Sequence, residues 1–179
     1  REQLRQGATQ IKLMAGGGVS SDYDPLDVAQ YTEAEFKAAV SAAENWGTYV
    51  TVHAYTPLAI KTAINAGVKC IDHGQLADDA TAKLMAEKGI WWSLQPFLDN
   101  PETTPFAAGS KNRLKQIEMT AGTDKAYALA KKYNIKTAWG TDVLFDPKLA
   151  AMQGAKLSAM TRWYTPFEIL KMATSTNAE

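Results

Sequence analysis

The sequence predicts an α/β fold built around a parallel sheet. Strand-like and helix-like segments alternate along the 179 residues in five successive βα units. Strands that are separated by one helix each pair in parallel, with right-handed crossovers. The length allows one substantial core and is too short for two ordinary domains, so we expect a single domain over residues 1–179. Periodicity alone does not separate a closed barrel from an open, doubly wound sheet.

The predicted strands are short apolar runs bounded by turn or loop residues. They cover residues 10–14, 49–54, 69–74, 90–94 and 136–142. The first run is followed by Gly16, Gly17 and Gly18, which lack the spacing of a phosphate-binding loop and suit a tight turn equally well.

The predicted helices combine an apolar face with recognisable start signals. Thr32 caps the first of them, whose acidic first turn suits the helix dipole. Pro57 stands at the first position of the second, and Asp78 or Asp79 caps the third. A polar insertion over residues 98–109 precedes the last ones. The helices are expected over residues 33–44, 57–66, 80–88, 112–133, 157–163 and 166–173.

Composition argues against several classes of partner. Basic and acidic residues balance at 19 each, so charge gives no reason to expect a nucleic acid or an anionic membrane surface. No apolar run approaches the roughly 18 residues of a membrane span. Cys70 is the single cysteine, which excludes an internal disulfide, and its apolar strand predicts a buried side chain.

The first residues predict that the chain is part of a longer protein. Residues 1–7 are charged, are typical of the last turns of a helix that closes on Gly7, and do not resemble a signal peptide. The chain also begins without Met. We therefore expect a fragment, and the sequence does not indicate a compartment.

Side chains that bind metals stand near the ends of the predicted strands. His53 and His73 are the two histidines of the chain, and each lies near the end of a strand, as does Asp142. In parallel α/β folds these ends gather on one face and form the active site. A lone histidine there is more often structural, but two on the same rim favour metal ligation. Imidazole and carboxylate groups suit zinc and related ions. This chemistry favours the β/α barrel.

Lys12 lies among apolar residues of the first strand, where an ammonium group is costly unless it is paired or neutralised. Two interpretations of Lys12 remain open. In the first, its ammonium group reaches the rim or pairs with Asp142. In the second, its amine reacts with carbon dioxide to give a carbamate that bridges two metal ions. Carbamate formation requires the neutral amine, which burial favours. Asp142 also has two interpretations. It caps a helix that starts at Val143, or it binds metal and takes a proton from the attacking water.

Tyr55 follows His53 by two residues and is the best candidate for a hydroxyl that contacts substrate. Ordinary packing at the start of the next helix explains it equally well. Trp91, Trp92 and Trp139 are most simply core residues, although one that faced the rim would line a pocket.

These motifs together resemble the amidohydrolase superfamily, in particular its imidazolonepropionase-like and Xaa-Pro dipeptidase-like branch. The resemblance covers essentially the whole chain, and four strand-end motifs in order make it specific. It implies a (β/α)8 TIM barrel of which this chain holds about five βα units, corresponding to strands 4 to 8. The similar stretches are residues 11–18, 52–55, 66–74, 139–142 and 165–178.

The resemblance also implies roles for the strand-end residues. Lys12 would be the carboxylated lysine that bridges two metals, and His53 and His73 would bind the second metal. Asp142 would bind the first metal and act as general base. The cofactor would be one or two divalent ions, commonly zinc, which activate water and polarise the scissile carbonyl. The substrates would be amide-type C–N bonds of N-acyl amino acids or dipeptides.

One part of the family's pattern is missing from the sequence. The family's first strand supplies a His-x-His pair, and this chain has no such motif. A complete barrel needs about 250 residues, so the first three βα units and the family's usual small β-sandwich are expected to lie outside this chain. We expect the chain alone to bind metal weakly and to turn over slowly or not at all.

Two other functions remain open. The same metal centre can hydrolyse phosphotriesters or lactones, and kinetics on both substrate classes would distinguish them. Alternatively, the chain is a non-catalytic half-barrel that forms a homo-oligomer or associates with the missing barrel segment. An incomplete barrel leaves strand edges and apolar helix faces unpaired, which favours association. A nucleotide-binding open sheet would need a phosphate-binding motif that the sequence lacks.

Overall fold

The computed structural model describes residues 1–100, 106–143 and 146–179 of the chain. A five-stranded parallel sheet forms its centre, with the strands in sequence order. The predicted strands and their parallel pairing are therefore confirmed, although the last strand ends before Asp142. The strands are β1 (Ile11–Met14), β2 (Val50–Ala54), β3 (Cys70–His73), β4 (Trp91–Leu94) and β5 (Thr137–Trp139).

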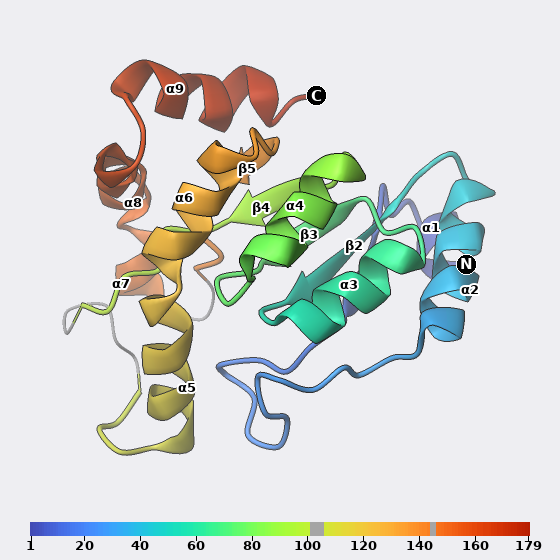
Figure 1. The fold of residues 1–179 in the computed structure, drawn as a ribbon, viewed down its shortest axis with the longest axis horizontal. Helices are drawn as coiled ribbons and strands as arrows, with labels where there is room; N and C mark the ends of the chain where they lie inside the picture. The colour runs from blue at the N-terminus through green and yellow to red at the C-terminus, as the bar shows by residue number, and fades with distance from the viewer. Residues whose placement is uncertain (101–105, 144–145) are drawn as a thin grey trace.

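The helices α3, α4 and α6 form a layer in front of the sheet in Figure 1. Helices α8 and α9 lie beyond β5, at the C-terminal end of the molecule. The helices are α1 (Glu2–Arg5), α2 (Glu33–Glu44), α3 (Pro57–Asn65), α4 (Asp79–Glu87), α5 (Lys111–Ala121), α6 (Thr123–Lys132), α7 (Pro147–Ala150), α8 (Gln153–Ala159) and α9 (Pro166–Lys171), with a 3₁₀ turn over Met160–Arg162 and a π-helical turn over Met172–Thr176.

The helix starts follow the predicted capping chemistry. Thr32 and Glu35 form a capping box at α2, because the Thr32 backbone N donates to the Glu35 carboxylate at 2.8 Å and the Glu35 backbone N donates to the Thr32 hydroxyl at 3.4 Å. Asp78, rather than Asp79, caps α4, and its carboxylate accepts a hydrogen bond from the backbone N of Thr81 at 2.7 Å.

The C-terminal half departs from the predicted elements in two places. The helix expected over residues 112–133 is two helices, α5 and α6, which meet at Gly122. A Cβ atom at Gly122 would collide with the backbone O of Gln75, so the chain passes this connection at a distance that only glycine allows. Helix α8 starts earlier than expected, and the four-residue α7 is too short to show a helical period. Within the predicted polar insertion, residues 101–105 lie outside the described residues.

Alternation along the strands separates an apolar face of the sheet from a polar one. The apolar row packs in the core beneath the helices and consists of Leu13, Val52, Ile71 and Trp92. The opposite face carries Lys12, Thr51, His53, Cys70, Asp72 and Ser93, together with the large apolar side chains of Met14 and Trp91. In a β/α barrel the face without helices is the interior, so Lys12 and His53 stand on the face that a barrel would enclose.

Strands β1 and β5 form the two edges of the described sheet. Asn177 covers part of the β5 edge: its Oδ1 accepts from the Trp139 backbone N at 2.9 Å, and its Nδ2 donates to the Trp139 backbone O at 2.8 Å. On β1, Met14 is 44% exposed. An edge strand with an exposed apolar side chain favours association with another chain. Among the described helices, none has both the length and the apolar character needed to cross a membrane.

Candidate metal and substrate site

The two histidine rings lie side by side, with their centroids 4.6 Å apart. His53 belongs to the polar face of the sheet, whereas simple alternation would place His73 with Ile71 on the apolar face. The backbone of His73 has a φ of +74°, however. This left-handed conformation costs a non-glycine residue roughly 1–2 kcal/mol. The left-handed backbone turns the His73 side chain away from the apolar face, where alternation would place it, and brings its ring to His53.

The strained backbone at His73 is held by the core. The indole Nε1 of the fully buried Trp92 donates to the backbone O of His73 at 2.7 Å. The next residue, Gly74, also has a left-handed φ of +73°. Strain of this kind persists where the surrounding packing determines the conformation, and it is concentrated at functional sites.

Gln95 determines which nitrogen of His73 carries the proton. The Nδ1 atom of His73 lies 2.7 Å from Gln95 Oε1, and Gln95 Nε2 donates to the backbone O of Ser93 at 3.0 Å. The amide is therefore oriented, and His73 Nδ1 must be the donor. The lone pair on His73 Nε2 then faces Asp142 Oδ2 at 3.9 Å. Two acceptors that face each other across this gap suit a cation placed between them.

His53 has the opposite tautomer. Its Nε2 lies 3.0 Å from the backbone O of Gly17 and therefore donates to it, which leaves the lone pair on Nδ1. The glycine loop after β1 thus orients one of the candidate ligands.

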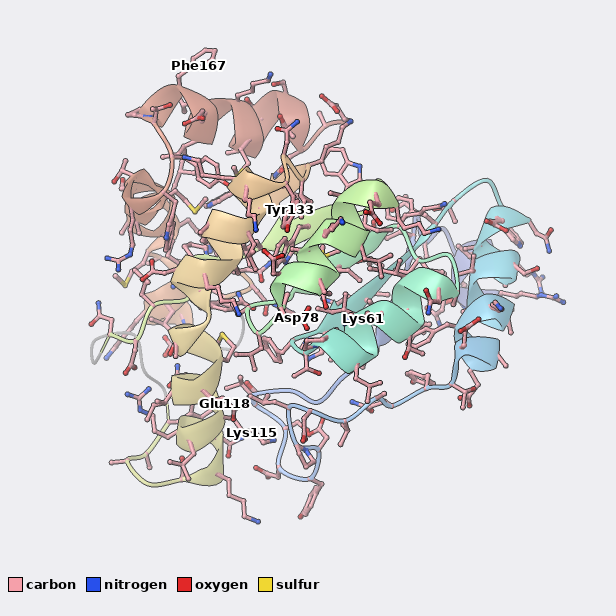
Figure 2. All side chains as sticks on the ribbon, in the orientation of Figure 1. Lys61, Asp78, Lys115, Glu118, Tyr133 and Phe167 are labelled. Carbon is pink, nitrogen blue, oxygen red and sulfur yellow. The ribbon has the colours of Figure 1, made fainter. Side chains whose placement is uncertain are left out.

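Lys115 on α5 fixes this loop in place (Figure 2). Its ammonium group donates to the backbone O atoms of Gly18, Ser21 and Asp24 at 3.0, 2.6 and 2.7 Å. Burial alone would raise the pKa of Asp24, but hydrogen bonds from Ser21 and from the Gly18 backbone N, together with the Lys115 charge, lower it below the ordinary value. The loop is therefore tied to α5 through an ionised carboxylate and an ammonium group.

Both histidines are neutral near pH 7. Burial lowers the pKa of His73 to about 3, and the charges of His53 and Lys12 act in the same direction. Burial also lowers the pKa of His53. The hydrogen bond to Gly17 raises this pKa, and the Lys12 charge lowers it. Neutral imidazole is the form that binds metal ions.

Lys12 lies on the same sheet face as His53, and it is paired with Asp72. Its Nζ lies 2.9 Å from Asp72 Oδ2, and the Thr51 hydroxyl donates to Asp72 Oδ1 at 3.1 Å. The alternative pairing with Asp142 is therefore wrong. The Lys12 side chain is 44% exposed, because β1 is an edge strand. The burial that would favour a neutral amine is incomplete in this chain.

Asp142 follows β5 in a left-handed conformation, with a φ of +48°. The alternative role as a helix cap before Val143 is wrong, since α7 begins at Pro147 and is capped by Asp146. The Asp142 side chain is 39% exposed. Partial burial of the carboxyl group raises the pKa of Asp142, whereas the charges of Lys12 and His53 lower it.

Tyr55 is buried and packs edge-on against His53, with ring centroids 4.9 Å apart. Its ring also lies 5.3 Å from that of His73. No hydrogen bond to the Tyr55 hydroxyl is formed by the part of the chain that the structure describes, and the residue lines a cavity together with Asp142. Burial raises its pKa, as does the Asp142 charge to a lesser extent, so the hydroxyl keeps its proton. Tyr55 thus packs in the core and also borders the cavity.

That cavity has a volume of about 320 Å³ and mostly apolar walls. Sequence reasoning did not find it, because its walls come from the insertion after β4 and from α5, α7 and α8. It also missed Gln95 and Asp72, although both stand at the ends of predicted strands, where polar residues are a signal for a site. The apolar wall includes Phe97, Phe106, Met119, Leu149 and Met152.

The donor set fits a divalent ion in part. Within the described ranges, no three His, Cys, Asp or Glu side chains form a group that could hold a metal ion by themselves. His53, His73 and Asp142 are three such residues, and the structure does not gather them into one group. The lone pairs of His53 and His73 and the Asp142 carboxylate suit zinc, whereas Lys12 fits only after its amine has been carboxylated.

Cys70 stands on the polar face beside Asp72 and is half-buried, not fully buried as the sequence predicts. We expect it to be unreactive in the folded chain. Burial raises its pKa to about 12, and the Asp72 charge acts in the same direction. The thiolate fraction at pH 8 is therefore very small. Alkylation by iodoacetamide at pH 8 is expected to be at least about tenfold slower than in the urea-unfolded chain. Equal rates in the two states would contradict the described burial.

Comparison with known proteins places this chain in a family. The model of the amidohydrolase family matches residues 1–179. Ochratoxinase from Aspergillus niger is 32% identical over 177 residues, which are 98% of this chain and 36% of that protein.

Solved structures show the same relationship. A prolidase in complex with N-methylphosphonate-L-proline has 33% identity and a TM-score of 0.90, over 99% of this chain and 44% of that one. A Xaa-Pro dipeptidase with bound methionine has 27% identity and a TM-score of 0.86, over 99% of this chain and 45% of that one. The chain thus spans less than half the length of these relatives, and its five-stranded sheet corresponds to part of their TIM barrel. The chain belongs to the amidohydrolase family.

Proposed function

We propose that the protein to which this chain contributes is a metal-dependent amidohydrolase that cleaves amide-type C–N bonds of N-acyl amino acids or dipeptides. The observation that carries the proposal is the orientation of His73 by Gln95, which turns the Nε2 lone pair toward Asp142 at 3.9 Å. The similarity to a prolidase and a Xaa-Pro dipeptidase supports this substrate class.

In this proposal His53, His73, Asp142 and, once carboxylated, Lys12 would together hold one or two divalent ions. Zinc suits this mixture of nitrogen and oxygen donors. When bound, such ions lower the pKa of water and polarise the scissile carbonyl.

Asp142 and Tyr55 would act on the substrate directly. Asp142 takes the proton of the attacking water and returns it to the leaving amine, as one carboxylate does in general base and then general acid catalysis. Burial raises the pKa of Asp142, which makes the carboxylate a stronger base. The Tyr55 hydroxyl, which keeps its proton, donates a hydrogen bond to a substrate oxygen.

Carboxylation of Lys12 requires a change from the described ion pair. The ammonium group must lose a proton and leave Asp72, after which its nitrogen forms a bond with the carbon of carbon dioxide and releases a second proton. The product is an anionic carbamate, which suits a position between two cations and no longer suits one beside Asp72.

Hydrolysis assays on the chain with zinc and bicarbonate test this function. We expect slow, zinc-dependent release of amino acids from N-acetyl amino acids or Xaa-Pro dipeptides. Asp142→Asn is expected to reduce the rate by about 10²–10⁴-fold, the usual contribution of general base catalysis, while Asp22→Asn, in the exposed loop after β1, leaves it unchanged. Faster hydrolysis of phosphotriesters or lactones would favour that alternative. Full activity with two tightly bound ions would contradict the expectation of a weak site.

Association of the chain is a separate proposal that the exposed β1 edge supports. We expect a mass above that of a monomer at micromolar concentration in light scattering. Met14→Lys places a charge on the edge and should shift the chain toward the monomer. Tyr23→Lys, at a 98% exposed loop residue, is the matched control and should leave the mass unchanged. A monomer at all concentrations would contradict the proposal.

A further inference from the structure

A lysine borders the cavity beside the candidate metal site. Lys156 of α8 lines the same cavity as Asp142 and Tyr55. The volume of about 320 Å³ is at the lower end of the range for small-molecule sites. The cavity therefore suits a group of the size of one amino acid.

Helix α8 is attached directly to the segment that carries Asp142. The hydroxyl of Thr141, one residue before Asp142, donates to Gln153 Oε1 at 2.7 Å. Gln153 and Lys156 are three residues apart in α8 and so lie on the same side of the helix. The side of α8 that is fixed to the β5 loop is thus the side that carries Lys156.

Lys156 has no anionic partner among the residues that the structure describes, Asp142 included. No ion pair or hydrogen bond to its ammonium group is formed within these ranges. The other two lysines near the site are paired, Lys12 with Asp72 and Lys115 with Asp24. Lys156 is partly buried, and this burial lowers its pKa. An ammonium group in such a position is costly without a counter-charge, and an anionic ligand would offset that cost.

We propose that Lys156 binds the carboxylate of an N-acyl amino acid or dipeptide whose apolar side chain packs against Phe97, Phe106 and Met119. This inference rests on the proposed function for the identity of the substrate, but not for binding itself. The carboxylate is one carbon away from the scissile nitrogen, so a substrate held between Asp142 and Lys156 presents both groups to the same cavity. Lys156 therefore selects substrates with a free carboxylate, and the apolar wall selects aromatic or large aliphatic side chains.

The test compares two probes that differ in one group, N-acetyl-L-phenylalanine and N-acetyl-L-phenylalaninamide. Calorimetric titration with the metal-free chain measures binding without turnover. The acid is expected to bind the wild-type chain about tenfold more tightly than the amide, since a charged hydrogen bond contributes about this much. Lys156→Met should remove the preference by weakening the acid alone, and Lys156→Arg should retain most of it.

Lys148→Met serves as the matched control, because Lys148 is an exposed lysine of neighbouring α7 that does not line the cavity. It should keep the tenfold preference. Equal binding of the two probes to the wild-type chain, no binding of either at millimolar concentration, or an equal loss in both lysine variants would overturn the proposal.

Kinetics with zinc separate this inference from the proposed function. In N-acyl amino acid hydrolysis, Lys156→Met should raise KM about tenfold and leave kcat nearly unchanged, as expected for loss of a binding contact. A preference for the acid without any hydrolysis would support the Lys156 site but not the proposed function, because the chain alone is expected to turn over slowly or not at all. Hydrolysis without a preference for the carboxylate would support the function and overturn the Lys156 site.

Discussion

Replacement of His73 by alanine is expected to weaken zinc binding by the chain at least about 100-fold, because the change removes one imidazole of the pair that would hold the ion. Calorimetric titration with zinc in bicarbonate buffer measures the effect. Gln95→Leu should weaken binding by about 10–100-fold, since it leaves the ligand in place but removes the acceptor that fixes its tautomer.

The control for the glutamine change is Gln116→Leu. Gln116 lies on α5, and its side chain is bonded to Arg113 rather than to a histidine. Its replacement should leave zinc affinity unchanged. If His73→Ala and Gln95→Leu bind zinc as tightly as the wild-type chain does, the ion is bound elsewhere and the candidate site is wrong.

Gly74→Ala is expected to lower the free energy of unfolding by about 3 kcal/mol or more, which combines the cost of a left-handed residue with that of a steric clash. A Cβ atom at Gly74, where φ is +73°, would lie 2.5 Å from the indole Nε1 of Trp92. That indole donates to the His73 backbone O, so the change disturbs the support of the candidate ligand as well as the core. Urea unfolding measures the loss.

Gly89→Ala separates the two costs of the Gly74 change. Gly89 has a similar φ of +64°, but a Cβ atom there would meet open space. Its replacement should cost only about 1 kcal/mol, from the backbone alone. Equal losses at the two positions would show that the contact with Trp92 does not restrict Gly74.

Local signals in the sequence were sufficient for most of the fold. Thr32 with Glu35 marks a helix start through bonds that span three residues. The strands are short apolar runs bounded by turn or loop residues, which is also a local pattern. The break at Gly122 could not be predicted in this way, since its cause is the backbone of Gln75, which is distant in sequence.

The site was predictable as a set of residue types but not in its contacts. Strand ends locate His53, His73 and Asp142 at one rim. The pairing of Lys12 with Asp72 depends on the register of three strands, because β2 lies between them. The left-handed backbone of His73 depends on Trp92, which follows on the next strand.

The cavity was beyond prediction for a related reason. Its walls combine the loop after β4 with α5, α7 and α8, and no sequence pattern indicates that these segments meet. Lys156 in particular has the spacing of an ordinary helix-surface lysine, and only its position beside Asp142 and Tyr55 distinguishes it.

A crystal structure of the chain grown with zinc and bicarbonate tests the central claim most directly. Anomalous scattering should locate an ion bonded to His53 Nδ1 and His73 Nε2, the nitrogens that the bonds to Gly17 and Gln95 leave free. Lys12 should have left Asp72 and carry a carboxylate that faces the ion. Zinc bound at other residues, with Lys12 still paired to Asp72 and both histidines without an ion, would contradict the account.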